Sequence, residues 1–154
     1  MDAGSSYLPS ELNAAYLWAQ LEQSDVVFDD RMRSWNLYYE RLKPLSEEGL
    51  IQIPHVPEEC GHNAHMFYIK LKNIDERTKF IQYMKENGIR CVFHYIPLHS
   101  SPAGRRYGRF HGSDEYTTRE SERLVRLPMY YGLSDMDIDR IIGCIKNFWV
   151  NCRI

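Results

Sequence analysis

The sequence predicts an α+β fold in which helices cover a small antiparallel sheet. Short stretches rich in β-branched and aromatic residues are interspersed with longer stretches whose apolar residues recur at three- and four-residue spacing. The extended stretches are few and the helical ones flank them, which is typical of a layered α+β domain. The length of 154 residues suits one domain. We therefore treat residues 1–154 as a single domain with one core.

Residues 10–45 are predicted to form a long helical connecting segment in two pieces. Ser10 stands where a side chain caps a helix, and Pro44 is expected to end the second piece. A helical stretch of this length needs a large surface to lie on. Apolar residues recur at helical spacing through both pieces: Leu12, Ala15, Tyr16 and Ala19, then Phe28, Met32, Trp35, Tyr39 and Leu42.

Three extended segments are expected to build the sheet. Residues 50–54 form a short one that leads into a polar loop. Residues 65–71 alternate and are rich in aromatic and β-branched side chains. Residues 90–96 form the third segment, which Pro97 stops. The covered sheet is thus assigned to the middle of the chain.

Two helices have clear boundaries in the sequence. One is expected over residues 75–87, with Gly88 in the left-handed position that follows a helix. Ser134 and Asp137 form a capping box that opens the closing helix. Its apolar stripe consists of Ile138, Ile141, Ile142, Ile145 and Trp149.

The stretch between these helices is predicted to be a loop followed by a third helix. Residues 100–114 are polar, basic and glycine-containing, and we assign them to a loop. Thr117 and Glu120 form a second capping box, which is expected to open a helix that ends at Arg126.

Composition excludes several functions. The 19 basic and 21 acidic residues nearly balance, which argues against a protein that binds a nucleic-acid polymer. No apolar run approaches the roughly 20 residues that span a bilayer, so no membrane partner is expected. The start of the chain lacks the charged and apolar regions of a signal peptide. The four cysteines form no CxxC pair and are expected to be free thiols. We expect a soluble cytoplasmic protein.

A metal site is not assigned. Cys60, His62 and His65 lie close together in sequence, and His55 is near them. Structural zinc sites usually draw two ligand pairs from separate segments, and no second pair is visible. A polar surface loop explains these residues equally well.

Three features could bind a ligand, and each has a plain structural alternative. His94 follows a predicted strand, where ligand groups often lie, or it bonds a backbone carbonyl. The stretch 105–111 interleaves arginines with rings, as in diphosphate sites, or it is a solvated basic loop. The hydroxyl-rich stretch 4–11 leads into a helix N-terminus, which suits phosphate, or it is only a cap.

Four blocks of the chain resemble the DegT-type sugar aminotransferases, which are pyridoxal-phosphate enzymes of the aspartate-aminotransferase fold (type I). The blocks follow in order: residues 4–22 (GSSYLPSELNAAYLWAQLE), 63–71 (NAHMFYIKL), 92–99 (VFHYIPLH) and 120–128 (ESERLVRLP). The resemblance runs over essentially the whole chain and implies the C-terminal small domain of that fold.

The resemblance also implies a reaction and its participants. Glutamate donates an amino group to C4 of dTDP-4-keto-6-deoxyglucose, with pyridoxal phosphate as the carrier, in a homodimer that serves cell-surface polysaccharide synthesis, as for enterobacterial common antigen and lipopolysaccharide. In the family's commoner pattern an asparagine reaches the cofactor phosphate of the neighbouring subunit, and in this chain Ser6 occupies that position. His94, Tyr95 and His99 border the nucleotide-sugar pocket, and Arg105 and Arg109 are candidate contacts to its diphosphate.

The chain departs from the family in its lysines. None of its six lysines lies in a segment like the family's Schiff-base lysine, and the large cofactor-binding domain is absent from it. We therefore assign no catalytic residue, expect no tightly bound cofactor, and expect the chain to be inactive alone, with Leu17 and Trp18 exposed and the chain self-associated. The alternative is a free-standing α+β module that binds a ligand or a partner.

Overall fold

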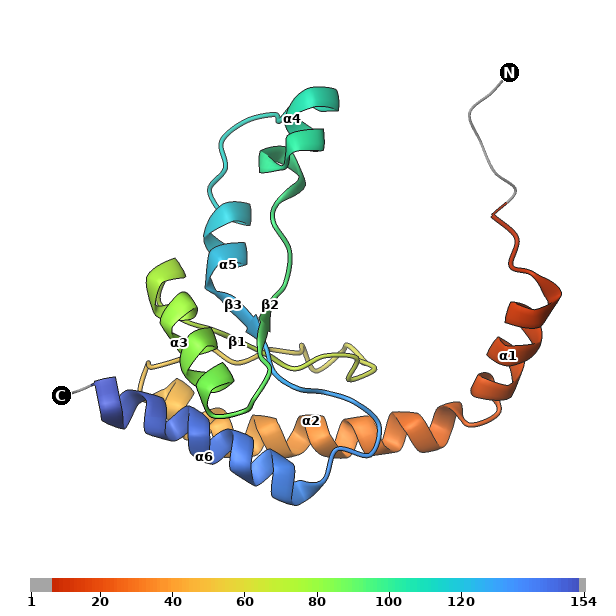
Figure 1. The fold of residues 1–154 in the computed structure, drawn as a ribbon, viewed down its shortest axis with the longest axis horizontal. Coiled ribbons are helices and arrows are strands. Elements are labelled where there is room, and N and C mark those ends of the chain that lie inside the picture. The colour runs from red at the N-terminus through yellow and green to blue at the C-terminus, as the bar shows by residue number, and fades with distance from the viewer. Residues whose placement is uncertain (1–6, 153–154) are drawn as a thin grey trace.

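The computed structural model describes residues 7–152 and has the expected α+β architecture (Figure 1). Three short strands form one antiparallel sheet in the order β1-β3-β2. In chain order the elements are α1 (Glu11–Leu21), α2 (Ser24–Glu47), β1 (Tyr68–Lys70), α3 (Ile74–Glu86), β2 (Val92–Phe93), the 3₁₀ turn η1 (Leu98–Ser100), α4 (Pro102–Tyr107), α5 (Thr117–Arg123), β3 (Leu124–Arg126) and α6 (Asp135–Cys152).

The central strand β3 lies where the sequence predicted the end of a helix, so that prediction is wrong. Helix α5 ends at Arg123, and Leu124 is already extended with φ −82° and ψ 131°. Val125 then pairs with Ile69 of β1 and Phe93 of β2. Its side chain is fully buried, so burial in the sheet overrides the helical pattern of the preceding residues.

The other extended segments are shorter than expected. Of the predicted strands 65–71 and 90–96, only the residues of β1 and β2 pair with a neighbouring strand. Residues 50–54 contribute a single bridge, in which the backbones of Gln52 and Lys70 exchange hydrogen bonds of 2.8 and 2.9 Å. The segment therefore borders the sheet at one point instead of forming a full strand.

One face of the sheet carries the core. Phe67, Ile69 and Leu71 alternate along the β1 segment, and each is no more than 1% exposed. Helices α2, α3 and α6 collect on this face: the ring of Tyr38 lies 5.2 Å from that of Phe67, and the ring of Phe80 lies 5.2 Å from that of Phe148. Figure 1 shows α2 and α6 side by side below the sheet. The expectation of a sheet covered on one face is confirmed.

The helical segment 10–45 divides into α1 and α2 as expected, but α2 does not end at Pro44. The helix continues to Glu47, and the amide of Glu48 donates to the Pro44 carbonyl at 3.0 Å. A proline inside a helix removes one hydrogen bond. Leu42 and Leu45 are buried on either side of it, and their packing offsets that loss.

The two predicted capping boxes have different outcomes. Ser134 accepts from the amide of Asp137 at 3.1 Å, and the whole predicted stripe of α6 is buried, so this prediction is confirmed. At α5, Thr117 makes no cap; the carboxylate of Asp114 accepts from the amide of Thr118 at 3.2 Å instead. Helix α3 ends as predicted, with Gly88 at φ +72°.

Two parts of the chain project from the core (Figure 1). Helix α1 buries none of its residues, and Leu17 and Trp18 are 54% and 69% exposed, as expected for the connecting segment. Residues 94–116, called here the arm, carry η1 and α4; the sequence had assigned 100–114 to a loop. Both projections expose large apolar side chains, as is typical of surfaces that another domain or protein covers.

We expect Ile69→Ala to lower the free energy of unfolding by about 2–5 kcal/mol, because it empties a fully buried site at the centre of the core. Ile96→Ala is the matched control, since Ile96 is 64% exposed in the arm and its loss is expected to cost no more than about 0.5 kcal/mol. Urea unfolding measures both. Equal losses would contradict the assignment of the core to one face.

Candidate functional site

The second face of the sheet is open and polar. Register places Tyr68, Arg126 and Val92 side by side on it, and all three are half-buried. Alternation along the β2 segment places Arg90 and His94 on the same face as Val92. Polar side chains from three separate parts of the sequence therefore meet at the face that the core helices do not cover.

A hollow of about 380 Å³ lies on this open face, and we call it the sheet-face hollow. Two arginines and one histidine line it, with no acidic residue among its lining side chains. Such a lining favours an anion. Its walls are His65, Met66, Arg90, Val92, Arg126, Leu127, Pro128 and Met129.

His94 lies at the base of the arm beside this face. Its Nδ1 is buried and finds no hydrogen-bond partner among the described residues. Burial lowers the pKa of His94, and the charge of Arg126 and then the nearby His65 lower it further. The ring is therefore held neutral near pH 7, which leaves a nitrogen able to bond a ligand hydroxyl or carbonyl. The Tyr95 ring stands 4.5 Å away, edge on.

His99 has a different environment from His94. Its Nε2 is 2.8 Å from the Asp114 carboxylate, and its ring packs at 4.4 Å on Phe110. The Thr118 hydroxyl and amide bond the same carboxylate and are the main reason that the pKa of Asp114 is lowered, with His99 adding to the effect. His99 thus clamps two ends of the arm together.

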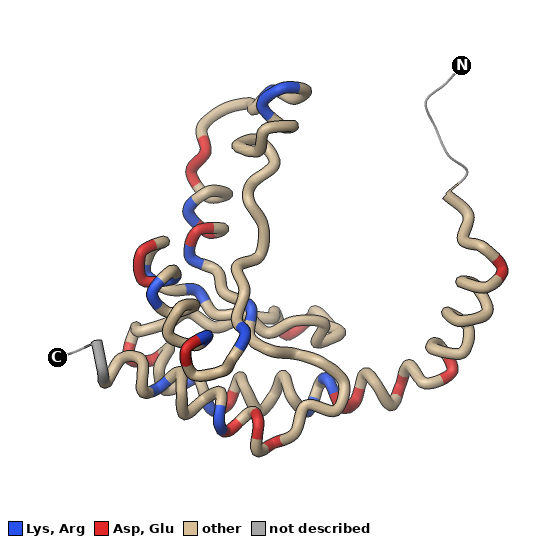
Figure 2. Tube along the Cα trace, viewed as in Figure 1, with Lys and Arg blue, Asp and Glu red and all other residues tan. Residues whose placement is uncertain are grey.

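The predicted arginines lie farther along the arm. Arg105 and Arg109 are exposed, and Figure 2 marks basic residues along α4, away from the sheet. The structure brings neither of them, nor His99, into the lining of the sheet-face hollow. Ser6, the predicted cofactor-phosphate residue, lies outside the described residues. The described site residues predicted from the sequence therefore fall into two groups: His94 and Tyr95 lie at the base of the arm beside the sheet, and His99, Arg105 and Arg109 lie farther along it.

Of the six lysines, the one within the strands is ion-paired and the other five are exposed. Lys70 is the one lysine of the β1 strand, and its Nζ lies 2.8 Å from the Glu120 carboxylate. Lys43 lies 3.9 Å from Glu47. Lys72, Lys79, Lys85 and Lys146 are exposed.

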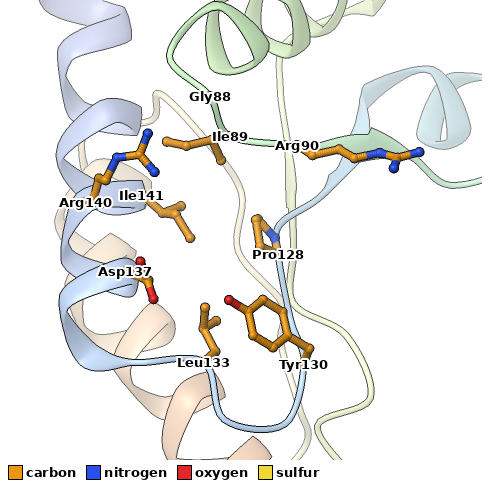
Figure 3. A pocket seen from close by; sticks show the side chains of 9 residues that line it. All are labelled: Gly88, Ile89, Arg90, Pro128, Tyr130, Leu133, Asp137, Arg140 and Ile141. Carbon is orange, nitrogen blue, oxygen red and sulfur yellow. The ribbon is translucent and has the colours of Figure 1, made fainter.

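A second hollow, of about 390 Å³, lies beside α6 (Figure 3). Its polar groups already have structural uses: Asp137 bonds Ser134 at the start of α6, and Arg140 donates to the Asn87 carbonyl at 2.7 Å. In Figure 3 the side chain of Arg90 extends away from this hollow. We assign it no ligand.

The sequence did not identify Arg126 and Arg90 as site residues. Arg126 was assigned to a helix, and a helix assignment does not predict which residues lie beside it on a sheet. The signal that could have found it is the apolar pair 124–125 directly before it, which reads equally well as a buried strand.

The cysteine and histidine loop makes no metal centre: nowhere between residues 7 and 150 do three His, Cys, Asp or Glu side chains gather around one point. His62 packs on the Trp35 ring at 4.4 Å instead. Cys60, Cys91 and Cys144 are free thiols, as predicted. Of the helices in the described part of the chain, none is long and apolar enough to cross a membrane.

Comparison with known proteins gives a family match. The model of the "DegT/DnrJ/EryC1/StrS aminotransferase family" matches residues 2–146. An uncharacterized protein of Methanocaldococcus jannaschii is 29% identical over 151 residues, and the dTDP-3-amino-3,6-dideoxy-alpha-D-galactopyranose transaminase of Aneurinibacillus thermoaerophilus is 27% identical over 142 residues. The alignments cover 95% and 90% of this chain but 38% and 36% of those proteins.

Solved structures agree with that match. A DegT DnrJ EryC1 StrS aminotransferase from Brucella abortus is 28% identical with a TM-score of 0.74, over 88% of this chain and 34% of that one. DesV from S. venezuelae, solved with a ketimine intermediate, has the same fold at 21% identity and a TM-score of 0.77, over 95% of this chain and 40% of its own. The chain thus spans little more than a third of the proteins it matches.

The Glu120 carboxylate provides a pH test of the open face. Its hydrogen bond to Lys70, with help from Arg119 and Arg123, lowers the pKa of Glu120 to about 2. A lowered pKa in the folded state stabilises the fold above the ordinary value near 4.5, and this stabilisation is lost as the pH falls towards 2. In urea unfolding we expect Glu120→Gln to be less stable than the unsubstituted chain at pH 7, with a gap that narrows as the pH falls below about 4.5 and closes only below about pH 2.

Glu58→Gln is the control for this measurement, because Glu58 is exposed in the 50–63 loop. Its stability is expected to follow that of the unsubstituted chain over the same pH range. A gap between Glu120→Gln and the unsubstituted chain that stays constant with pH would show that the charge of Glu120 is not what stabilises the α5–β1 contact.

Proposed function

This chain belongs to the DegT/DnrJ/EryC1/StrS aminotransferase family, and we propose that it is the C-terminal small domain of a pyridoxal-phosphate-dependent sugar aminotransferase, with residues 10–45 as its connecting segment. The observation that carries the proposal is the match of nearly the whole chain to about a third of such enzymes. The cytoplasmic location expected from the sequence is kept as part of it.

In this proposal the chain supplies the substrate side of an active site. His94 presents a buried, unbonded ring nitrogen at the open face, and the exposed Tyr95 ring stands beside it. A neutral imidazole and a phenol can both bond sugar hydroxyls or a sugar carbonyl. Arg105 and Arg109, with His99 holding the arm in shape, are proposed to contact the diphosphate.

The residues of the described chain do not by themselves fit a pyridoxal phosphate site. Lys70 is engaged by Glu120, and the other five lysines are exposed, with none of them in the lining of the sheet-face hollow. When bound, the cofactor supplies an electron sink for the carbon that gains or loses the amino group. We place its Schiff-base lysine in the large domain of the longer enzyme, and Ser6 remains the proposed contact of this chain to the cofactor phosphate.

The proposed substrate is dTDP-4-keto-6-deoxyglucose, and the proposed amino donor is glutamate. The amino sugar formed would be a precursor of a cell-surface polysaccharide. The four sequence blocks carry this proposal. It gains support from the Aneurinibacillus relative, whose name states a dTDP-linked, 6-deoxy amino sugar. That relative acts at C3 by its name, so the position of amination is the part of the proposal that needs the most direct test.

The test uses the complete reading frame around this chain. We expect it to encode an upstream large domain with a lysine, and the purified enzyme to convert the 4-keto sugar to its 4-amino product with glutamate, as followed by mass spectrometry and NMR of the product. His94→Ala is expected to lower kcat/KM about tenfold, the effect of one lost hydrogen bond of about 1.4 kcal/mol.

His55→Ala is the matched control, because His55 is exposed and is neither in the lining of the sheet-face hollow nor among the proposed substrate contacts. It is expected to leave kcat/KM unchanged. The 154-residue chain assayed alone with pyridoxal phosphate should form no amino sugar. Turnover by the chain alone, or a reading frame with no large domain, would overturn the proposal in favour of a free-standing binding module.

The exposed apolar residues of α1 are proposed to face the large domain or the second subunit of a homodimer. Without that cover, we expect the 154-residue chain to self-associate, and Leu17→Glu to lower its average mass in sedimentation equilibrium. Asn36→Glu adds the same charge to an exposed position of α2 and should leave the mass unchanged. A monomeric unsubstituted chain would contradict this prediction.

A further inference from the structure

Arg126 differs from the other half-buried arginines of the described chain. Each of those has a protein acceptor, whereas Arg126 has neither a hydrogen bond nor an ion pair within residues 7–150, and its Nε is buried. The acceptors of the others are the Ala64 carbonyl for Arg31, Asp30 for Arg33, Asp139 for Arg41, the Ser121 carbonyl for Arg77, and Glu120 for Arg123.

An unpaired guanidinium in this position is costly. Burial removes the Nε–H donor of Arg126 from water, and the cost of that burial is offset only when an acceptor is present. Arg126 sits on the central strand, so its backbone is fixed by pairing on both sides. The side chain can therefore not relieve the cost by moving with a flexible segment.

The surroundings of Arg126 increase the positive potential instead of neutralising it. Arg90 lines the same hollow, and Figure 3 shows its side chain directed away from Asp137, a nearby carboxylate. His65 is also part of the lining. His94 keeps an unbonded Nδ1 beside Arg126. Two arginines and one histidine line the hollow, His94 lies beside it and no carboxylate lines it, so the component that this site lacks is an anion.

We propose that the sheet-face hollow binds the oxyanion group of a small molecule, a carboxylate or a phosphate, through Arg126 and Arg90. A guanidinium presents two parallel N–H groups that match two oxygens of either group. A volume of about 380 Å³ is within the range of small-ligand sites. This goes beyond the proposed function, because the site concerns arginines to which the family resemblance gives no role and it holds whether or not the chain is part of a transaminase.

The test is isothermal titration of the 154-residue chain at low ionic strength in two arms. One arm uses glutamate and 2-oxoglutarate as carboxylate probes, and the other uses inorganic phosphate and pyrophosphate. Saturable binding in the first arm identifies a carboxylate ligand, and in the second a phosphate ligand; either result supports the site. Arg126→Gln is expected to weaken that binding at least tenfold, and Arg90→Gln several-fold.

Lys79→Gln is the charge-matched control, because Lys79 is exposed on α3, which covers the opposite face of the sheet. It should leave binding unchanged. Absence of saturable binding in both arms, or an equal loss in Lys79→Gln and Arg126→Gln, would overturn the proposal. Thermal unfolding verifies that Arg126→Gln is folded. If this variant does not fold, Arg90→Gln tests the site instead, because Arg90 is exposed.

This outcome is separate from that of the proposed function. A complete enzyme that aminates the sugar while the chain binds neither class of probe would refute the oxyanion site alone. A chain that binds a probe through Arg126, from a gene that encodes no large domain, would refute the transaminase proposal alone.

Discussion

Burial of a three-residue central strand is the constraint on which the rest of the structure depends. Val125 is fully buried and pairs with β1 on one side and β2 on the other. This residue therefore joins the three strands and anchors the sheet in the core. With strands of two or three residues, the sheet has little backbone pairing to stabilise it. Its stability must come from one apolar face packed on α2, α3 and α6. All three core helices therefore lie on the same side.

The polar and charged side chains of the strands lie on the other face of the sheet. The residues that alternate with the core residues cannot be buried in apolar surroundings, and the sequence fills these positions with arginine, lysine, tyrosine and histidine. Lys70 is neutralised by Glu120, and Arg126 is not neutralised within the described chain. The same alternation that builds the core thus produces a charged surface on the sheet, and the site residues are fixed by the strands that fix the core.

Helix patterns were the predictable part of this fold, and short strands were not. The α6 stripe and its Ser134 cap, the Gly88 end of α3 and the break between α1 and α2 are all local signals, and each is confirmed. β3 has three residues and no alternation long enough to detect, and Pro44 stays helical only through the packing of distant residues. Among the site residues, His94 could be predicted because it follows a predicted strand. Arg126 could not be predicted because the sequence assigned it to a helix.

The contact between His99 and Asp114 joins two residues of the arm that are 15 positions apart in the sequence and so closes a loop. Closing such a loop restricts the chain, and here that loss of conformational entropy occurs during folding. A surface that is ordered beforehand loses less freedom when something docks on it, and it associates without waiting for a rearrangement. A ligand or partner that approaches the basic residues of α4 therefore meets a segment whose ends are already held together.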